Sequence, residues 1–315
     1  MDPSILRNED RLIIEQVAEK SGYRLVVSND DAKFKAVLQD VVIAAGELPG
    51  NLIAGAGSLK WFQQFGSGGD WIIPFDGIRD SALTITTISD NHYHSLAEHV
   101  FAFILAIVRQ LHLSVRAQTE HRWHKPEKES LVDLSEMDLL LLGVGSIGKR
   151  VAHLANAFGM RTVGLRRERK QADAALERCV SREELFDVLP DADIVVDCLP
   201  LTPETCHMID GAAFQAMKNT AIFVNIGRGG TVDQEALIEA LQKGEIAAAG
   251  LDVFETEPLP QGSPLWDMEN VLITGHYAGL SISLFQRSID VFIDNLSRFL
   301  SGEPLRNAVD KRRCY

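Results

Sequence analysis

The run LLLLGVGSIG at residues 139–148 carries the clearest chemical signal in the sequence. Leucines typical of a buried strand lead directly into glycines with the spacing GxGxxG, and a helix-like segment follows. In this arrangement the first glycine permits a tight turn, the second lets the backbone approach a pyrophosphate, and the third lets strand and helix pack closely. The N–H groups and the dipole at the helix N-terminus favour an anion. The spacing therefore predicts a dinucleotide site formed by Gly143, Gly145, Ser146, Ile147 and Gly148.

A cluster of basic residues follows the next expected strand, residues 162–165. In an NAD site, an acidic side chain about 20 positions further along the chain holds the ribose hydroxyls at the end of this strand. Here the strand runs into RRERK at 166–170, with no carboxylate at the strand end. Guanidinium groups can pair bidentately with phosphate, although a solvated basic loop is the alternative interpretation. The position favours binding of a 2′-phosphate by Arg166, Arg167 and Arg169, and therefore NADP(H), with NAD(H) possible.

Short apolar runs alternate with helix-length segments along most of the chain, which is typical of βαβ units and a parallel sheet. The pattern predicts an α/β fold with parallel sheets flanked by helices. Strands are expected at 24–27, 41–45, 61–65, 83–88, 139–144, 162–165, 194–198, 221–226, 248–253 and 271–274, and helices at 147–158, 183–189 and 233–243.

Residues 95–113 predict a long helix that is apolar around nearly its whole circumference. Such a helix is buried on several sides, either at a domain junction or subunit interface, or as a central core helix. Turn-forming residues at 89–91 precede it, so a domain boundary is expected near 90–97. A second long helix, amphipathic, is expected at 281–300.

The composition is that of an acidic globular protein. The 315 residues include 31 Lys+Arg and 44 Asp+Glu, a formal net charge of −13, whereas nucleic acids and anionic membranes bind basic surfaces. The densest apolar run, 100–108, is much shorter than the ~20 residues that span a bilayer, and no apolar signal core precedes it at the N-terminus. The cysteines show neither CxxC spacing nor a disulfide-like density. We therefore expect a cytoplasmic protein with no metal site, nucleic-acid partner or membrane partner.

Five ordered motifs give the sequence a specific resemblance to a known family. They are GVGSIGKRVAHLANAFGMRTVG, DIVVDCLPLTPET, NIGRGGTVDQEALIEAL, AGLDVFETEPLP and ITGHYAG. Through them, residues 95–282 strongly resemble the D-isomer-specific 2-hydroxyacid dehydrogenases, and residues 59–70 resemble them more weakly.

The resemblance implies two Rossmann-like domains with a cleft between them, the coenzyme domain being inserted into the substrate domain. A substrate-binding, flavodoxin-like domain is then expected at 1–94 and 283–315, and a dinucleotide-binding Rossmann domain at 95–282. The helix at 95–113 would begin the coenzyme domain and contribute to the interface of a homodimer. Family members usually open with a short strand, but none is evident before the helix near 11–19. The N-terminal domain is therefore expected to be abbreviated or differently wound.

The resemblance also places a catalytic set at Arg228, Glu257 and His276. Reduction of a 2-oxoacid needs a cation for the carboxylate, a hydride for the carbonyl carbon and a proton for its oxygen. The Arg228 guanidinium could grip the carboxylate and polarise the carbonyl. His276 would be the general acid in reduction and the general base in oxidation. The Glu257 carboxylate would favour the protonated imidazole and fix its orientation, while the nearby Glu255 is expected to be structural.

Three further cofactor positions follow from the same motifs. Asp252 corresponds to the residue that hydrogen-bonds the nicotinamide carboxamide, and Pro200 and Ile226 are expected beside the cofactor.

The expected substrate site contains Arg228, His276 and Tyr277, together with a glycine loop at 66–70. N–H groups of Ser67, Gly68 and Gly69 are expected to bind the substrate carboxylate, although a plain glycine turn is the alternative. Two positions depart from the family pattern: glycine replaces the usual proline before His276, and Tyr277 replaces a small or aliphatic residue.

These residues predict an oxidoreductase that transfers a hydride between NAD(P)H, with NADPH favoured, and a small 2-oxoacid such as glyoxylate or hydroxypyruvate, giving the D-2-hydroxyacid. An alternative is a dinucleotide-sensing scaffold similar to the C-terminal-binding-protein corepressors, which keep the same catalytic set. Formate dehydrogenase-like chemistry is disfavoured, because that branch has glutamine where Glu257 stands.

Overall fold

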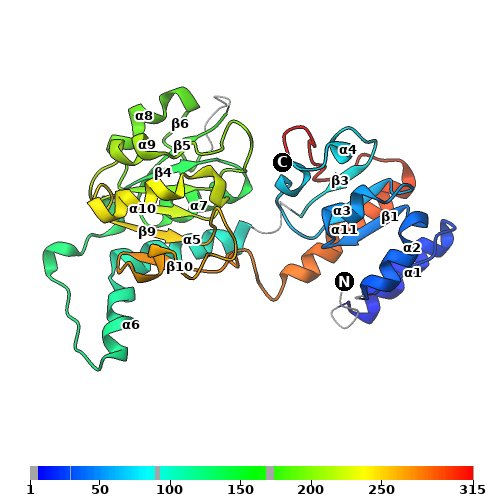
Figure 1. Ribbon diagram of the computed structural model, residues 1–315, viewed down its shortest axis with the longest axis horizontal. Coiled ribbons are helices and arrows are strands. Elements are labelled where there is room, and N and C mark those ends of the chain that lie inside the picture. The colour runs from blue at the N-terminus through cyan, green and yellow to red at the C-terminus, as the bar shows by residue number, and fades with distance from the viewer. Residues whose placement is uncertain (1–5, 29, 89–92, 168–173, 315) are drawn as a thin grey trace. The chain divides into compact units, whose positions relative to one another are not determined.

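The computed structural model divides the chain into two compact units, and each is described here by itself. It describes residues 6–28, 30–88, 93–167 and 174–314. Unit 1 comprises Met1–His92 and Ser281–Tyr315, and unit 2 comprises Tyr93–Leu280 (Figure 1). Unit 1 is therefore built from both ends of the chain, with unit 2 inserted between them. The boundary cluster expected at 89–91 lies outside the described residues.

Unit 2 contains a seven-stranded sheet in its described residues, with the order β10-β9-β8-β7-β4-β5-β6 and every neighbouring pair parallel. The first strand of this sheet in the sequence is the interior strand β4; the chain continues outward through β5 and β6 and then returns to β7 on the other side of β4. The strand order therefore reverses between β4 and β7, which is where open α/β sheets bind ligands at their carboxyl edge. The strands are β4 (Asp138–Leu142), β5 (Arg161–Leu165), β6 (Arg178–Val180), β7 (Ile194–Asp197), β8 (Ile222–Asn225), β9 (Ala248–Leu251) and β10 (Val271–Ile273).

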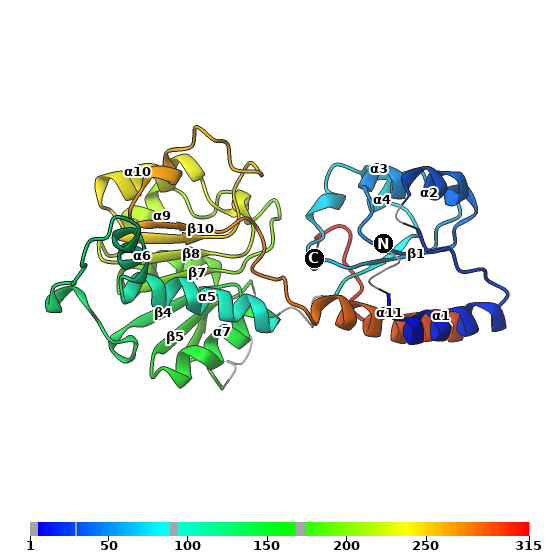
Figure 2. The same ribbon diagram turned by 90° about the horizontal axis from the view of Figure 1, so that it is seen from below.

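Helices cover both faces of this sheet (Figure 2). Helices α5 (Tyr93–Val108) and α7 (Ser146–Ala157) pack on one face, in a core that includes Leu139 and Leu141. Helices α8 (Leu185–Val188), α9 (Gly211–Ala216) and α10 (Gln234–Lys243) lie on the other, with Leu140 and Leu142. Successive side chains of a strand point to opposite faces, so the leucine run supplies both cores. The predicted α/β fold with parallel sheets and flanking helices is confirmed.

The expected helix at 95–113 is interrupted, which corrects the sequence prediction. Helix α5 ends at Val108, and α6 (Leu111–Thr119) begins after Gln110, whose φ of 52° is left-handed. The two axes differ by 69°. No glycine or proline lies at the break, and the apolar pattern of the helix continues across it, so the pattern did not predict the break. Among the described residues no single helix is long and apolar enough to cross a membrane, and α5 with α6 meets that criterion only as this bent pair.

The described residues of unit 1 form a three-stranded parallel sheet with the order β1-β2-β3. One face of this sheet packs against α3 and α4, and the other face packs against α1 and the long helix α11 (Figure 2). On the α11 face, the Trp61 ring stacks on Phe292 and Phe299 at centroid distances of 5.4 and 5.5 Å. The elements are α1 (Asn8–Lys20), α2 (Asp31–Val37), β1 (Ile43–Gly46), α3 (Gly50–Ala54), β2 (Trp61–Gln64), α4 (Asp76–Arg79), β3 (Thr84–Thr86) and α11 (Leu284–Ser301).

Two short segments differ from the predicted strands. Residues 24–27 form no strand, although Leu25 and Val27 do pack against the core that contains α11. Conversely, Arg178–Val180 forms the edge strand β6, which was not predicted. Apolar alternation at 24–27 therefore identified two partly buried side chains but did not identify backbone pairing.

Candidate active site

The glycine turn after β4 has the geometry that a dinucleotide requires. Gly143 has a φ of +92°, and a Cβ on Gly148 would lie 2.2 Å from the Gly143 carbonyl oxygen, so strand and helix approach too closely for a side chain. Gly145, the N-cap of α7, is exposed, and a Cβ there would contact nothing within 4 Å. Ser146 and Ile147 open α7. The turn leaves open backbone at a helix N-terminus, which fits a pyrophosphate.

The basic cluster after β5 is only partly within the described residues, because Arg169 lies outside them. The Arg166 guanidinium turns back to the glycine turn, where Nη2 donates to the Val144 carbonyl at 2.8 Å. Its Nε is buried without a hydrogen-bond partner. Arg167 is exposed and pairs with Glu204, Nη2 to Oε1, at 3.4 Å. Arg166 therefore stabilises the glycine turn through Val144, whereas the charged group of Arg167 is exposed to solvent.

Arg228 follows β8 on a tightly hydrogen-bonded loop. Its carbonyl accepts from Asn225 Nδ2 at 3.1 Å, and the Thr231 hydroxyl lies 2.6 Å from the same carbonyl. The Thr231 hydroxyl also lies 2.5 Å from Asp197 Oδ2 at the end of β7, and Asp197 Oδ1 accepts the Leu199 N–H at 2.8 Å. Burial raises the pKa of Asp197 to about 7, against the opposing effect of these two donors. Asp197, which the sequence analysis missed, thus connects the loops after β7 and β8.

His276 and Glu257 form a pair in unit 2, with His276 Nδ1 2.6 Å from Glu257 Oε2. The other carboxylate oxygen, Oε1, accepts the Phe254 N–H at 2.9 Å, and this bond fixes the orientation of the carboxylate. About half of the His276 side chain is exposed, leaving Nε2 for a substrate. Glu255 pairs instead with His207 Nε2 at 2.7 Å. The geometry distinguishes the two glutamates, since only Glu257 contacts His276.

Asp252, at the end of β9, holds the loop that carries His276. Its carbonyl accepts the His276 N–H at 2.8 Å. Its carboxylate, almost fully buried, accepts the N–H of Tyr277 at 3.1 Å and of Ala278 at 3.0 Å. His276 has a φ of 55°, a left-handed conformation that costs about 1–3 kcal/mol outside glycine. The three bonds to Asp252 compensate for this strain.

Two polar residues outside the predicted set complete this loop. The Thr274 hydroxyl donates to Asp252 Oδ1 at 2.5 Å, and His99 Nε2 on α5 lies 3.0 Å from the Thr274 oxygen. The only sequence signal was a histidine beside the apolar stripe of a helix. The predicted Tyr277 is 48% exposed, with its ring edge to face with His99.

The residues predicted near the nicotinamide follow adjacent strands. Pro200 follows β7, Ile226 is buried after β8, and Arg228, Asp252 and His276 follow β8, β9 and β10. Because parallel strands end at one edge, unit 2 brings the predicted catalytic and cofactor residues to the carboxyl edge of its sheet.

The glycine loop at 66–69 belongs to unit 1, where it follows β2. Gln64 fixes the loop, because its Nε2 donates to the Gly68 carbonyl at 2.9 Å and its Oε1 accepts from Trp71 Nε1 at 2.7 Å. A Cβ on Gly69 would lie 2.5 Å from the Cys314 carbonyl oxygen, so the chain near its C-terminus packs directly on the loop. Ser67 and Gly68 are half-buried. The loop is therefore an ordered part of unit 1 rather than a loose turn.

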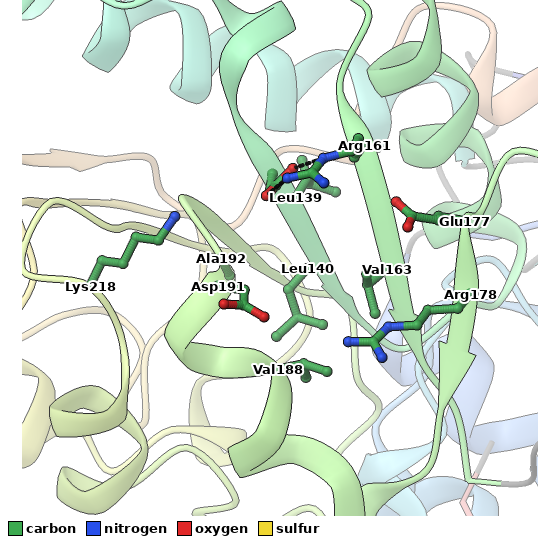
Figure 3. Close-up of a pocket in the computed structure, with 11 residues that line it drawn as sticks. Leu139, Leu140, Arg161, Val163, Glu177, Arg178, Val188, Asp191, Ala192 and Lys218 are labelled. Carbon is green, nitrogen blue, oxygen red and sulfur yellow. Dashed lines mark hydrogen bonds and ion pairs between the residues drawn. The ribbon is translucent and has the colours of Figure 1, made fainter.

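A cavity of about 370 Å³ lies at the opposite edge of the unit 2 sheet, at the amino ends of its strands (Figure 3). Arg161 at its rim pairs with Asp138, Nε to Oδ1, at 2.7 Å, and Lys218 pairs with Asp193 at 2.6 Å. The cavity therefore lies at the sheet edge opposite the one that carries the residues of the candidate site. Within the described chain, no group of His, Cys, Asp or Glu side chains is arranged to hold a metal ion.

Comparison with known families matches residues 101–278 to the family described as "D-isomer specific 2-hydroxyacid dehydrogenase, NAD binding domain". The matched segment contains the glycine turn and the residues predicted as catalytic.

Individual proteins show the same similarity. The chain is 40% identical over 219 residues to glyoxylate/hydroxypyruvate reductase B of Enterobacter sp. strain 638, covering 69% of this chain and 67% of that protein. Among curated relatives it matches, this chain spans about two thirds of their length, 65–67% in three cases.

Solved structures extend the similarity over more of the chain. A D-isomer specific 2-hydroxyacid dehydrogenase from Xanthobacter autotrophicus Py2, in complex with NADPH and MES, is 35% identical with a TM-score of 0.78, covering 88% of this chain and 86% of that one. An NADPH-dependent glyoxylate/hydroxypyruvate reductase from Sinorhizobium meliloti, in complex with NADP and sulfate, is 26% identical with a TM-score of 0.83, covering 95% and 96%.

Proposed function

Because the chain belongs to the D-isomer-specific 2-hydroxyacid dehydrogenase family, and is therefore an NAD(P)-dependent oxidoreductase, we propose that it reduces a small 2-oxoacid to the D-2-hydroxyacid with NADPH as the favoured donor. The observation that carries this proposal is the His276–Glu257 pair at 2.6 Å, on the same sheet edge as Arg228. Two of the named relatives are glyoxylate/hydroxypyruvate reductases. They favour an enzyme over a corepressor-like scaffold.

The residues of unit 2 fit a dinucleotide. The turn at Gly143, Gly145 and Gly148 provides open backbone at the N-terminus of α7, and the buried Nε of Arg166 is a donor without a partner. Ser146, Ile147, Pro200 and Ile226 would line the same side of the site. When bound, the nicotinamide supplies the hydride.

The chain's own residues would do the remaining chemistry. The Arg228 guanidinium binds the carboxylate of the 2-oxoacid and polarises its carbonyl, with the Ser67–Gly69 loop as a second carboxylate contact. His276 Nε2 donates a proton to the carbonyl oxygen as the alkoxide develops. Glu257, held by the Phe254 N–H, orients the imidazole through Nδ1. Tyr277 would shape the substrate pocket, and Asp252 would contact the nicotinamide carboxamide.

The preference for NADPH rests on the basic cluster after β5. Arg167 is exposed there, and its partner Glu204 is also exposed, so a 2′-phosphate can compete for the guanidinium. Arg166 and Arg169 would add to this positive charge. The two solved structures named above contain NADPH or NADP.

We further propose a homodimer acting in a reducing compartment such as the cytoplasm. Leu111, Val115 and Trp123, on α6 and just after it, are 51, 60 and 91% exposed, and exposed apolar side chains of this kind are what a second copy could cover. The cysteines are all free. Light scattering of the purified protein tests the dimer.

A panel of initial rates tests the activity. Glyoxylate, hydroxypyruvate, pyruvate and phenylpyruvate are each assayed with NADPH and with NADH, and the product is analysed on a chiral column. We expect turnover of at least one small 2-oxoacid to the D-product, with kcat/KM higher for NADPH. No turnover of any substrate would contradict the enzyme proposal. A preference for NADH of about tenfold or more, which equals ~1.4 kcal/mol, would contradict the role of the basic cluster.

A further inference from the structure

The His276 loop depends on Asp252 for its strained conformation, and the Asp252 carboxylate also contacts the Thr274 hydroxyl, which in turn contacts His99. A carboxylate only accepts hydrogen bonds, so the Thr274 hydroxyl must donate its hydrogen to Asp252 Oδ1, 2.5 Å away. The Thr274 oxygen then acts as acceptor for His99 Nε2 at 3.0 Å, and Nε2 must carry the hydrogen. The contacts define one direction of donation, from His99 through Thr274 to Asp252.

The environment of His99 keeps it in this neutral, donating form. Burial lowers the pKa of His99, and the Asp252 charge opposes this only in part. The ring lies edge to face with Phe103 at 4.7 Å and with Tyr277 at 5.4 Å. His99 thus contacts the residue that follows His276 and, through Thr274, the carboxylate that holds the loop.

We propose that His99 is a positioning residue for the reaction, which holds the His276 loop through Thr274 and Asp252. This inference rests on the proposed function, because it assigns His99 an effect on the proton donor. Gly275 stands immediately before His276 where the family usually has proline, so the backbone at this point is not stiffened by a pyrrolidine ring. The hydrogen bonds that start at His99 supply the restraint instead. Helix α5 is thereby linked to the catalytic loop within unit 2.

A pair of substitutions separates hydrogen bonding from ring packing. His99→Phe keeps an aromatic ring against Phe103 and Tyr277 but removes the donor. His99→Gln removes the ring but keeps an N–H near the position of Nε2. His153→Phe is the matched control, because His153 is an exposed histidine on α7 of the same unit that bonds only to the Lys149 carbonyl.

The first readout is hydrogen–deuterium exchange of the peptide 271–280 in the full chain. It reports the N–H groups of Tyr277 and Ala278 that Asp252 accepts, and it does not depend on activity. We expect exchange to accelerate about tenfold in His99→Phe, as the loss of one part-buried hydrogen bond implies, and to stay near wild type in His99→Gln and His153→Phe.

The second readout is steady-state kinetics. In His99→Phe we expect kcat to fall about tenfold with KM for the 2-oxoacid changed less than about twofold, because Arg228 and the substrate loop are untouched. His99→Gln should recover most of this loss. Equal loss in both variants, or unchanged exchange and kcat in His99→Phe, would overturn the proposal. If the wild type itself shows no turnover, the proposed function fails, while the exchange result still decides whether His99 restrains the loop.

Discussion

At the scale of single residues, two glutamates two positions apart have different partners. Glu257 contacts His276 and Glu255 contacts His207, at 2.6 and 2.7 Å. Both are histidine–carboxylate pairs with part-exposed side chains, so charge alone does not distinguish their roles. Their location does, because only His276 belongs to the loop after β10 that Asp252 holds.

Glu257→Gln is expected to lower kcat by about 100-fold, because proton transfer by a positioned side chain contributes at least that factor and depends on the protonated, oriented imidazole. KM should change little, since Glu257 does not hold the substrate. Initial rates with the best 2-oxoacid of the panel provide the measurement. Glu255→Gln, the same substitution in the same loop, should keep kcat within about twofold. Comparable losses in the two variants would contradict the assignment.

The residues of the candidate site could be predicted from the sequence because motif spacing fixes which side chains follow which strands. The family resemblance selected Glu257 rather than Glu255, and the structure pairs it with His276. Thr274, His99 and Asp197 were missed, because their contacts join segments far apart in the chain. Tertiary hydrogen bonds such as His99–Thr274, 175 residues apart, leave no local pattern.

At the scale of elements, the glycine turn between β4 and α7 serves two separable purposes. Gly148 allows helix and strand to approach, whereas Gly145 leaves open space in front of the helix N-terminus. Packing and ligand binding are therefore assigned to different glycines of one motif.

Gly148→Ala should lower the thermal midpoint of unfolding by several degrees, because its Cβ would lie 2.2 Å from the Gly143 carbonyl oxygen. Gly145→Ala should leave the midpoint nearly unchanged and weaken NADPH binding instead, because its Cβ meets no protein atom. Thermal unfolding and NADPH fluorescence titration of both variants are the measurements. The reverse assignment of effects would refute this division.

The end of β7 gives the protein a pH-dependent element. Burial raises the pKa of Asp197 to about 7, above the ordinary value of about 3.9 in an unfolded chain. The folded state therefore binds this proton more tightly, and the associated stability is present below about pH 4 and lost as the pH rises towards 7. Wild type should lose stability relative to Asp197→Asn between pH 5 and pH 8 in thermal unfolding. A constant difference across this range would exclude ionisation of Asp197 as the cause.

The elements themselves were predictable where the physics is local. Apolar runs located β7, β8 and β9, whose residues are all buried, and β4, which is buried except at Asp138. The break at Gln110 was not predictable, because a left-handed glutamine has no sequence signature and the helical pattern continues across it. Strand β6 was missed because three residues at a sheet edge carry too short a pattern.

At the scale of the whole molecule, unit 2 is continuous in the chain and unit 1 is not. Unit 2 has its complete sheet and hydrophobic cores on both faces. A fragment of residues 93–280 should therefore fold by itself and bind NADPH, but it should not reduce 2-oxoacids, because the Ser67–Gly69 loop, proposed as a carboxylate contact, belongs to unit 1. Circular dichroism, fluorescence titration and the rate panel test this. An unfolded fragment, or one with full turnover, would contradict the division of labour.

The net charge of −13 describes the protein as a whole and not its anion-binding places. Arg166 and Arg167 lie after β5, and Arg228 follows β8 in a sheet whose strands all end at the same edge. Positive charge is thus concentrated where substrate and cofactor phosphate are proposed to bind. The acidic remainder disfavours larger polyanions.

The way unit 1 draws on both ends of the chain also sets an order of events on the ribosome. Strand β2 leaves the exit tunnel early, but Phe292 and Phe299, which stack on Trp61, follow more than 200 residues later. At a synthesis rate of about 5–20 residues per second, roughly 10–50 s pass between the synthesis of Trp61 and that of the two phenylalanines. Unit 2 has been fully synthesised by then. The nascent chain therefore carries a complete unit 2 and an incomplete unit 1, whose sheet still lacks the aromatic residues of α11, and this is the species a chaperone would meet.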